Sequence, residues 1–174
     1  MRQSPQDAHD LLLSLGAPKR LILHGQLVGE AADALIFAFH SLGLMFREDV
    51  IRLGAALHDA GKILHPTELD GPGHNHELNG ERLLLDAGVA PEIARCCVSH
   101  ARHASMQVTV EELIVALADQ LWKGKRDEAL ELRVIDAAAA MGGKTRWDLF
   151  AALDTAFEDI ASKADERLAR SQPS

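Results

Sequence analysis

The chain has 174 residues, of which 47% are hydrophobic and 25% are charged, and its formal net charge is −8. A chain of this length and composition can bury the core of one globular domain. The acidic balance argues against general nucleic-acid binding, which depends on clustered lysines and arginines that neutralise phosphates.

The N-terminal segment MRQSPQDAHD has neither the apolar stretch nor the small-residue cleavage site of a secretory signal. No apolar run approaches the length that spans a membrane. We therefore expect a cytoplasmic protein with no membrane partner. Cys96 and Cys97 are adjacent, which suits neither a structural disulfide nor a zinc site, and we expect buried, reduced thiols.

Helix signals follow one another along the chain, without strand-like alternation. Ser4 and Pro5 have the character of an N-cap and a first helical residue, and Thr109 with Glu112 forms a capping box. HPTELDGPGHN (65–75) is the one loop with several helix breakers, and RSQPS (170–174) has the composition of a frayed tail. The sequence predicts an all-α fold, a compact single-domain helical bundle over residues 1–174. Expected helices cover residues 5–16, 19–42, 48–60, 76–87, 91–101, 109–122, 127–141 and 146–168, with those after residue 126 packing on a functional core of about 20–126.

Histidines are concentrated around a histidine–aspartate doublet, His58 and Asp59, that directly follows the apolar run VIRLGAAL. Six of the nine histidines lie in this part of the chain: His58, His65, His74, His76, His100 and His103. Any one of them could be a solvated or hydrogen-bonded core residue. Their clustering favours a shared function.

Two further polar residues stand where apolar ones are expected. Asp119 lies in EELIVALADQLW, which is apolar on nearly every face of a helix, so its carboxylate needs a cation, either an ion-pair partner or a metal. His24 lies near the start of the long helix, and an antiparallel hairpin would bring that end close to His58 and Asp59.

The pattern of His24, the doublet His58–Asp59 and the distant Asp119 resembles the HD-domain superfamily of metal-dependent phosphohydrolases, over about residues 20–126. LHDAGK and ALADQLWK are similar to the family's surroundings of these residues. The resemblance implies that these four side chains bind one metal ion. In many members extra histidines bind a second ion, and NHELNGERLL with CCVSHARH is similar to that pattern, so His76 and His100 would bind it with Asp59 as the bridge. His103, one turn from His100, would join or replace it or contact the substrate.

Imidazole and carboxylate ligands favour divalent transition metals, here two ions, and do not distinguish iron, manganese, nickel, cobalt and zinc. Two such ions can activate water towards phosphorus. The expected partner is therefore a small-molecule phosphorylated substrate, with nucleotides among the candidates, whose ester or anhydride is hydrolysed. Asp59 and Lys62 would be catalytic. Lys62 and Lys123 would bind the substrate, Arg20 and Arg102 are weaker candidates, and the plain alternative for both lysines is a solvated position near a helix end.

Two other functions stay open. The same six ligands resemble those of myo-inositol oxygenase and certain organophosphonate oxygenases, which use a mixed-valence di-iron centre. The short interval between His100 and Asp119 and the absence of tyrosine favour the hydrolase. A non-catalytic binding module that retains a metal is the third possibility, and the intact ligand set argues against it.

We expect no direct part in the chemistry for the remaining residues of interest. His65 and His74 would line the site's mouth or face solvent, and His9 and His40 would be surface residues. Trp122 and Trp147 would be core or partly buried packing residues. The sequence leaves the oligomeric state open.

Overall fold

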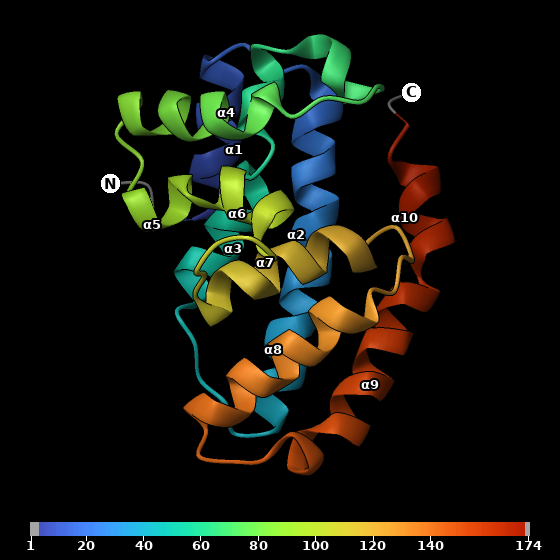
Figure 1. Ribbon diagram of the computed structural model, residues 1–174. Helices are drawn as coiled ribbons and strands as arrows, with labels where there is room; N and C mark the ends of the chain where they lie inside the picture. Colours follow the sequence, from blue (N-terminus) through green and yellow to red (C-terminus); the bar gives the residue numbers. More distant parts are fainter. Residues whose placement is uncertain (1–3, 173–174) are drawn as a thin grey trace.

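The computed structural model describes residues 4–172 and shows a helical bundle without strands over that range, so the all-α prediction is confirmed (Figure 1). The α-helices are joined by short turns, and two 3-10 turns, η1 (Ala60–Ile63) and η2 (Pro66–Leu69), follow α3. The α-helices are α1 (Pro5–Ser14), α2 (Lys19–Ser41), α3 (Glu48–Leu57), α4 (Asn75–Asp86), α5 (Pro91–Ala94), α6 (Cys96–Arg102), α7 (Val110–Leu121), α8 (Glu128–Met141), α9 (Arg146–Ser162) and α10 (Ala164–Arg170).

Helix starts follow the capping signals of the sequence. At α1 the Ser4 hydroxyl accepts from Asp7 N at 3.2 Å while Asp7 accepts from Ser4 N at 3.1 Å, which is a capping box. At α7 Thr109 and Glu112 exchange the same pair of bonds, at 3.2 and 2.7 Å. Each box satisfies backbone donors that would otherwise have no partner.

Three expected helices differ from those in the structure, one in where it ends and two in being interrupted. The helix predicted over 48–60 ends at Leu57, so the doublet lies in the turn after α3 rather than on a helix. Asp59 has φ −101° and ψ 13°, outside the helical region, and the chain tightens from there into η1. The helix predicted over 91–101 is interrupted at Arg95, and the one predicted over 146–168 is interrupted at Lys163.

α2 is the axis of the bundle. It contacts α3, α7 and α9, and its residues Ala31, Ala32 and Leu35 have no exposed surface. One apolar cluster joins most of α2 to α7, α8 and α9, and a second joins the start of α2 to α1, α3, the end of α4 and α5. The candidate site lies where these two clusters meet.

The expectation that no segment approaches membrane-spanning length is wrong for α2. By length and composition this helix is long and apolar enough to cross a membrane, with a mean hydropathy of 1.3. Within the molecule, 44% of that stretch is buried, and α2 contacts α1, α3, α7 and α9. The core helix of a bundle meets the same criterion, so this property does not assign α2 to a membrane.

The C-terminal helices return along α2. In Figure 1, α9 and α10 run side by side with α2 and end near its beginning. α9 buries Leu153 and Phe157, whereas Trp147 in its first turn is 76% exposed. The expectation of a packing role is therefore wrong for Trp147, which lies off the buried stripe of α9. Trp122 is buried, as expected.

Candidate metal centre

Five separate segments supply the six candidate ligands. His24 lies in the second turn of α2, and His58 and Asp59 lie in the turn after α3. His76 is the second residue of α4, His100 lies in α6 and Asp119 lies in α7. Buried residues of these segments pack in the core, so the side chains meet inside the bundle.

Two glycines let these segments approach each other closely. A Cβ at Gly25 would lie 2.7 Å from the carbonyl oxygen of Ala56, so only glycine lets α2 approach α3 this closely. This contact sets His24 beside His58. A Cβ at Gly61 would overlap the carbonyl of His76, and the glycine therefore lets the turn that carries Asp59 lie against the start of α4.

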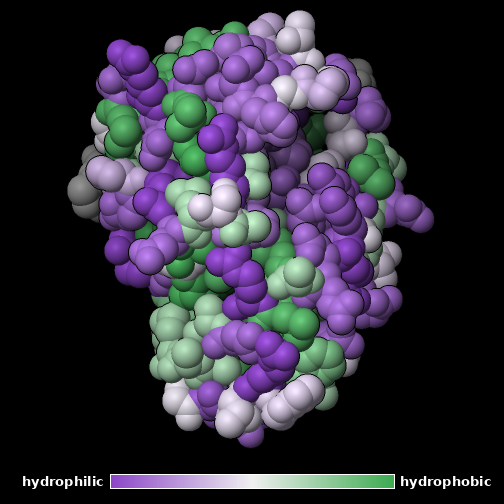
Figure 2. All heavy atoms as spheres, viewed as in Figure 1, coloured by the Kyte–Doolittle hydropathy of each residue, from purple (hydrophilic) through white to green (hydrophobic). Residues whose placement is uncertain are grey.

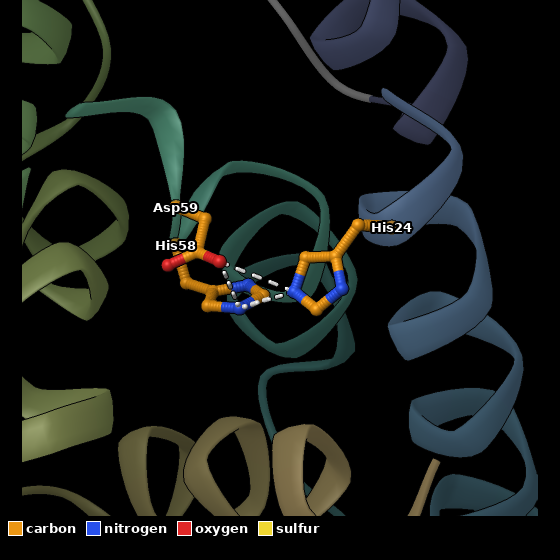
Figure 3. A group of neighbouring side chains, drawn as sticks. All are labelled: His24, His58 and Asp59. Carbon is orange, nitrogen blue, oxygen red and sulfur yellow. Dashed lines mark hydrogen bonds and ion pairs between the residues drawn. The ribbon is translucent and has the colours of Figure 1, made fainter. Parts of the chain in front are cut away.

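One oxygen of Asp59 faces the beginning of α2. His24 Nε2 lies 3.2 Å from Asp59 Oδ2 and 3.3 Å from His58 Nε2. Figure 3 shows the His24 and His58 rings pointing toward each other and toward the Asp59 carboxylate. Asp119 Oδ1 completes this group, 3.3 Å from His58 Nε2 and 3.6 Å from His24 Nε2. We call His24, His58, Asp119 and Asp59 Oδ2 the Oδ2 face.

The second oxygen of Asp59 faces the other two histidines. Asp59 Oδ1 lies 3.5 Å from His76 Nε2 and 3.6 Å from His100 Nε2. We call these three groups the Oδ1 face. The ligand atoms of three groups lie close enough together to surround one ion: His24, His58 and Asp59; Asp59, His76 and His100; and His58, His100 and Asp119, a group that draws on both faces. The structure thus brings together all six predicted ligands, with Asp59 between the two faces.

The histidine rings are oriented from behind. Nδ1 of His58 donates to the carbonyl of Ala55 at 2.9 Å, and Nδ1 of His100 donates to the carbonyl of Cys96 at 3.0 Å. These bonds place the ring proton on Nδ1 and leave the Nε2 lone pair directed into the site, as in histidines that bind metals.

Glu68 orients His76 in the same way, and the sequence reading missed it. Its Oε2 accepts from His76 Nδ1 at 2.5 Å and from His76 N at 3.1 Å, and Oε1 accepts from Asn75 N at 3.2 Å. Burial opposes the ionised carboxyl, but these bonds lower the pKa of Glu68 to about 2. Glu68 lies in the breaker-rich loop, where no periodic pattern marks a buried residue.

The charges of the site are balanced by imidazole and Lys62. Burial alone would raise the pKa of both carboxyls, but His58 and the neighbouring histidines lower the pKa of Asp59 and of Asp119 well below the usual range. Burial likewise opposes a charged His24, yet its bonds to the two aspartates raise the pKa of His24 to about 9. Without metal, a proton on His24 therefore supplies the positive charge that the carboxylates require.

A cleft of about 180 Å³ opens onto the Oδ2 face. Lys62 lines it and donates to Asp59 Oδ2 at 2.7 Å, and Arg20, one turn before His24, lines it as well. Lys62 is the only lysine or arginine paired with Asp59 or Asp119 within residues 4–172. A salt bridge to lysine or arginine therefore does not account for the buried Asp119 carboxylate, whose basic partners among the described residues are His24 and His58.

Several other predicted residues lie away from the cleft. The His103 carbonyl accepts from Arg133 at 2.8 Å, and Arg102 pairs with Glu77. Lys123 is exposed because α7 ends at Leu121, before the helical spacing from Asp119 could carry it to the site. The substrate contacts expected of His103 and Lys123 stay predictions.

The remaining histidines divide between surface and core. His74 is exposed and pairs with Glu77 at 3.0 Å, and His65 contacts Asn79 at 2.7 Å. His40 is exposed, as expected. The prediction of a surface position is wrong for His9, which is 8% exposed because α1 buries it together with its apolar face.

Comparison with known proteins bears on this geometry. The family model of the HD domain matches residues 26–123, more than half of the chain. The chain belongs to the HD-domain family. The matched range contains five of the six candidate ligands of this HD domain, and His24 lies two residues before it. Searches of curated proteins and of solved structures found no match.

Proposed function

We propose that this HD domain is a metal-dependent phosphohydrolase with two divalent transition-metal ions, acting on the phosphate ester or anhydride of a small phosphorylated compound, nucleotides included. The observation that carries the proposal is the position of Asp59. Its two oxygens face two different sets of imidazoles, as a carboxylate shared by two ions must.

The donor set fits such ions. His24, His58, Asp119 and Asp59 Oδ2 would hold one ion, and His76, His100 and Asp59 Oδ1 would hold the other. Mixed imidazole and carboxylate donors suit manganese, iron, cobalt, nickel or zinc better than calcium. When bound, the ions supply Lewis-acid activation of water and of the phosphoryl group.

The chain's own residues orient and bind. Lys62 holds the Asp59 carboxylate from the cleft side, and its ammonium is within reach of an anionic substrate there. Trp122 packs edge-on against the His24 ring, with centroids 5.0 Å apart, and fixes the ring's orientation. Arg20 adds a second positive charge at the rim of the cleft.

The test is hydrolysis by the full chain loaded in turn with each candidate metal, without oxygen, against phosphomonoesters, phosphoanhydrides and nucleotides. We expect release of inorganic phosphate by the loaded protein and none by the metal-free protein. Asp119→Ala should abolish turnover, whereas Asp86→Ala at the exposed end of α4 should retain it. Absence of phosphate release with every metal would contradict the proposal, and substrate-dependent oxygen consumption by the iron form would favour the oxygenase.

A further inference from the structure

We propose that the end of the C-terminal helix α10 forms one wall of the substrate cleft, and that this wall and Arg20 restrict the substrate to a compact phosphate monoester rather than a nucleotide. This inference rests on the proposed function and narrows its substrate class. It concerns residues outside the range that matches the family model, which ends at residue 123.

α10 is anchored to the middle of α2 and to the end of α9. Arg170 forms a two-point ion pair with Glu30 of α2, with both N–O distances 2.8 Å. Arg167 is 5% exposed and donates to the carbonyl of Ile160 at 2.7 Å. The expectation of a frayed tail is therefore wrong for Arg170 and Ser171, and residues 173–174 lie outside the described part of the chain.

These anchors place Ser171 at the site. Ser171 lines the same cleft as His24, Asp59 and Lys62, although it is 112 residues from Asp59 in the chain. In Figure 1 the end of α10 lies on the same side of the molecule as the beginning of α2, and Figure 2 shows a shaded recess at the upper right of this face. The cleft is thus closed on one side by the last described turn of the chain.

The cleft has room for a small group only. Pockets that enclose drug-sized ligands measure roughly 300–1,000 Å³, whereas this cleft measures about 180 Å³. Its apolar lining consists of Leu21, Leu69 and Trp122. A phosphoryl group and a short carbon skeleton match this size better than a nucleoside does.

The charged lining suits a phosphoryl group. Lys62 and Arg20 present two cations, and Asp70 pairs with the Arg20 guanidinium at 2.5 Å and holds it at the rim. Asp59 also lines the cleft, and its negative charge is opposed by Lys62. An anion with the compact, doubly charged form of a phosphate monoester can contact both cations.

The lining offers no ring face for a nucleobase. Among the described lining residues the aromatic rings are those of Trp122 and His24, and they pack edge-on against each other. Trp122 is 8% exposed. Base stacking needs an accessible aromatic face, so a nucleotide would gain little here beyond its phosphate.

The experiment measures binding, so that its result does not depend on turnover. Manganese-loaded full chain is titrated calorimetrically, without oxygen, with ethylphosphonate and with a nucleoside 5′-phosphonate, whose C–P bonds resist hydrolysis. We expect the compact ligand to bind about tenfold more tightly or better, from the restricted volume. Equal affinities, or tighter binding of the nucleoside, would overturn the inference.

Variants of the wall give the second readout. Ser171→Trp, at the cleft, should weaken ethylphosphonate binding about tenfold by filling the space, whereas Ser162→Trp, at the exposed end of α9, should have no effect. Arg170→Ala should reduce the preference for the compact ligand by releasing α10. Its matched control is Arg146→Ala, which breaks a similar two-point pair with Asp136 away from the cleft.

Arg20→Ala tests the cation separately. It should weaken ethylphosphonate binding about three- to tenfold, because one charge-assisted contact at a partly exposed rim is lost. Arg82→Ala, an exposed arginine on α4, is the control. Unchanged binding in both Ser171→Trp and Arg20→Ala would refute the inference even if the protein hydrolyses phosphate esters. Conversely, tight and selective phosphonate binding without hydrolysis would refute the proposed function alone.

Discussion

The two faces of Asp59 differ in what surrounds them. On the Oδ2 face, His24 and Asp119 retain 22% and 15% of their side-chain exposure, and the cleft opens there. On the Oδ1 face, His76 and His100 retain 9% and 7%. The open face includes a second carboxylate, that of Asp119, whereas the enclosed face has Glu68 behind His76. One carboxylate therefore joins an accessible half of the site to a buried half, and the variants below separate the two.

The largest effect is expected from Asp59→Asn, which removes the charge shared by both faces. We expect the affinity for metal to fall at least about 100-fold on each face, because an amide is a poor replacement for a bridging carboxylate. Elemental analysis after dialysis measures the loss, with Asp70→Asn as an exposed control. A variant that keeps one full equivalent of metal would show that Asp59 serves only one face.

A smaller, one-sided loss is expected when a ligand of a single face is removed. Asp119→Ala should empty the Oδ2 face, and His76→Ala should empty the Oδ1 face, so that each variant keeps one ion. Native mass spectrometry of the loaded proteins counts the ions. If either variant lost both ions, the faces would not be separable sites.

Glu68→Gln should weaken the enclosed face without removing a ligand. The charged acceptor behind His76 is lost, and metal affinity on this face should fall about 10- to 100-fold, as for other partners of metal-binding histidines. Competition with a chelator measures the change. Glu77→Gln removes an equally buried charge that contacts Arg102 and His74 rather than a ligand, and it should leave the affinity unchanged.

The smallest expected effect is the release of a proton from His24 when metal binds. The pKa of His24 is raised to about 9 in the metal-free protein, and a histidine must be neutral to bind metal, so loading the open face at pH 7.5 should release about one proton. Affinity should therefore rise with pH until about pH 9. Because folding raises the pKa of His24, protonated His24 also stabilises the metal-free fold. This contribution is full below pH 6.5 and is lost as the pH rises through 9.

Calorimetry in buffers of different ionisation enthalpy measures that proton. His24→Gln should abolish the buffer dependence at the open face. Metal binding with no buffer dependence at pH 7.5 in the wild-type protein would contradict the assignment of a charged His24.

The helical fold and the convergence of His24, the doublet and Asp119 could be predicted because they leave local signals, whereas His76 and His100 were expected from the family resemblance. Capping residues and apolar periodicity mark the helices, and a polar residue such as Asp119 inside an apolar helix marks an interior site. His24 and the doublet could be placed together because a helical hairpin brings those ends close. The close approaches at Gly25 and Gly61, which make the convergence exact, depend on backbone contacts that the sequence does not display.

Interactions between distant segments account for what the sequence reading missed. Glu68 is buried because its loop folds over the start of α4, and Ser171 reaches the cleft because Arg167 and Arg170 anchor α10 to Ile160 of α9 and Glu30 of α2. The helical spacing that pointed Lys123 towards the site extends past Leu121, where α7 ends, and its substrate contact stays a prediction. In each case the deciding contact is tertiary and lies outside any local pattern.

The most direct test of the account is an anomalous-difference map from crystals of the manganese-loaded protein. We predict two anomalous peaks, one within about 2.3 Å of each Asp59 oxygen, the usual length of metal–carboxylate bonds. A single peak remote from Asp59, or no peak among the six side chains, would contradict the central claim that this carboxylate is shared by two ions.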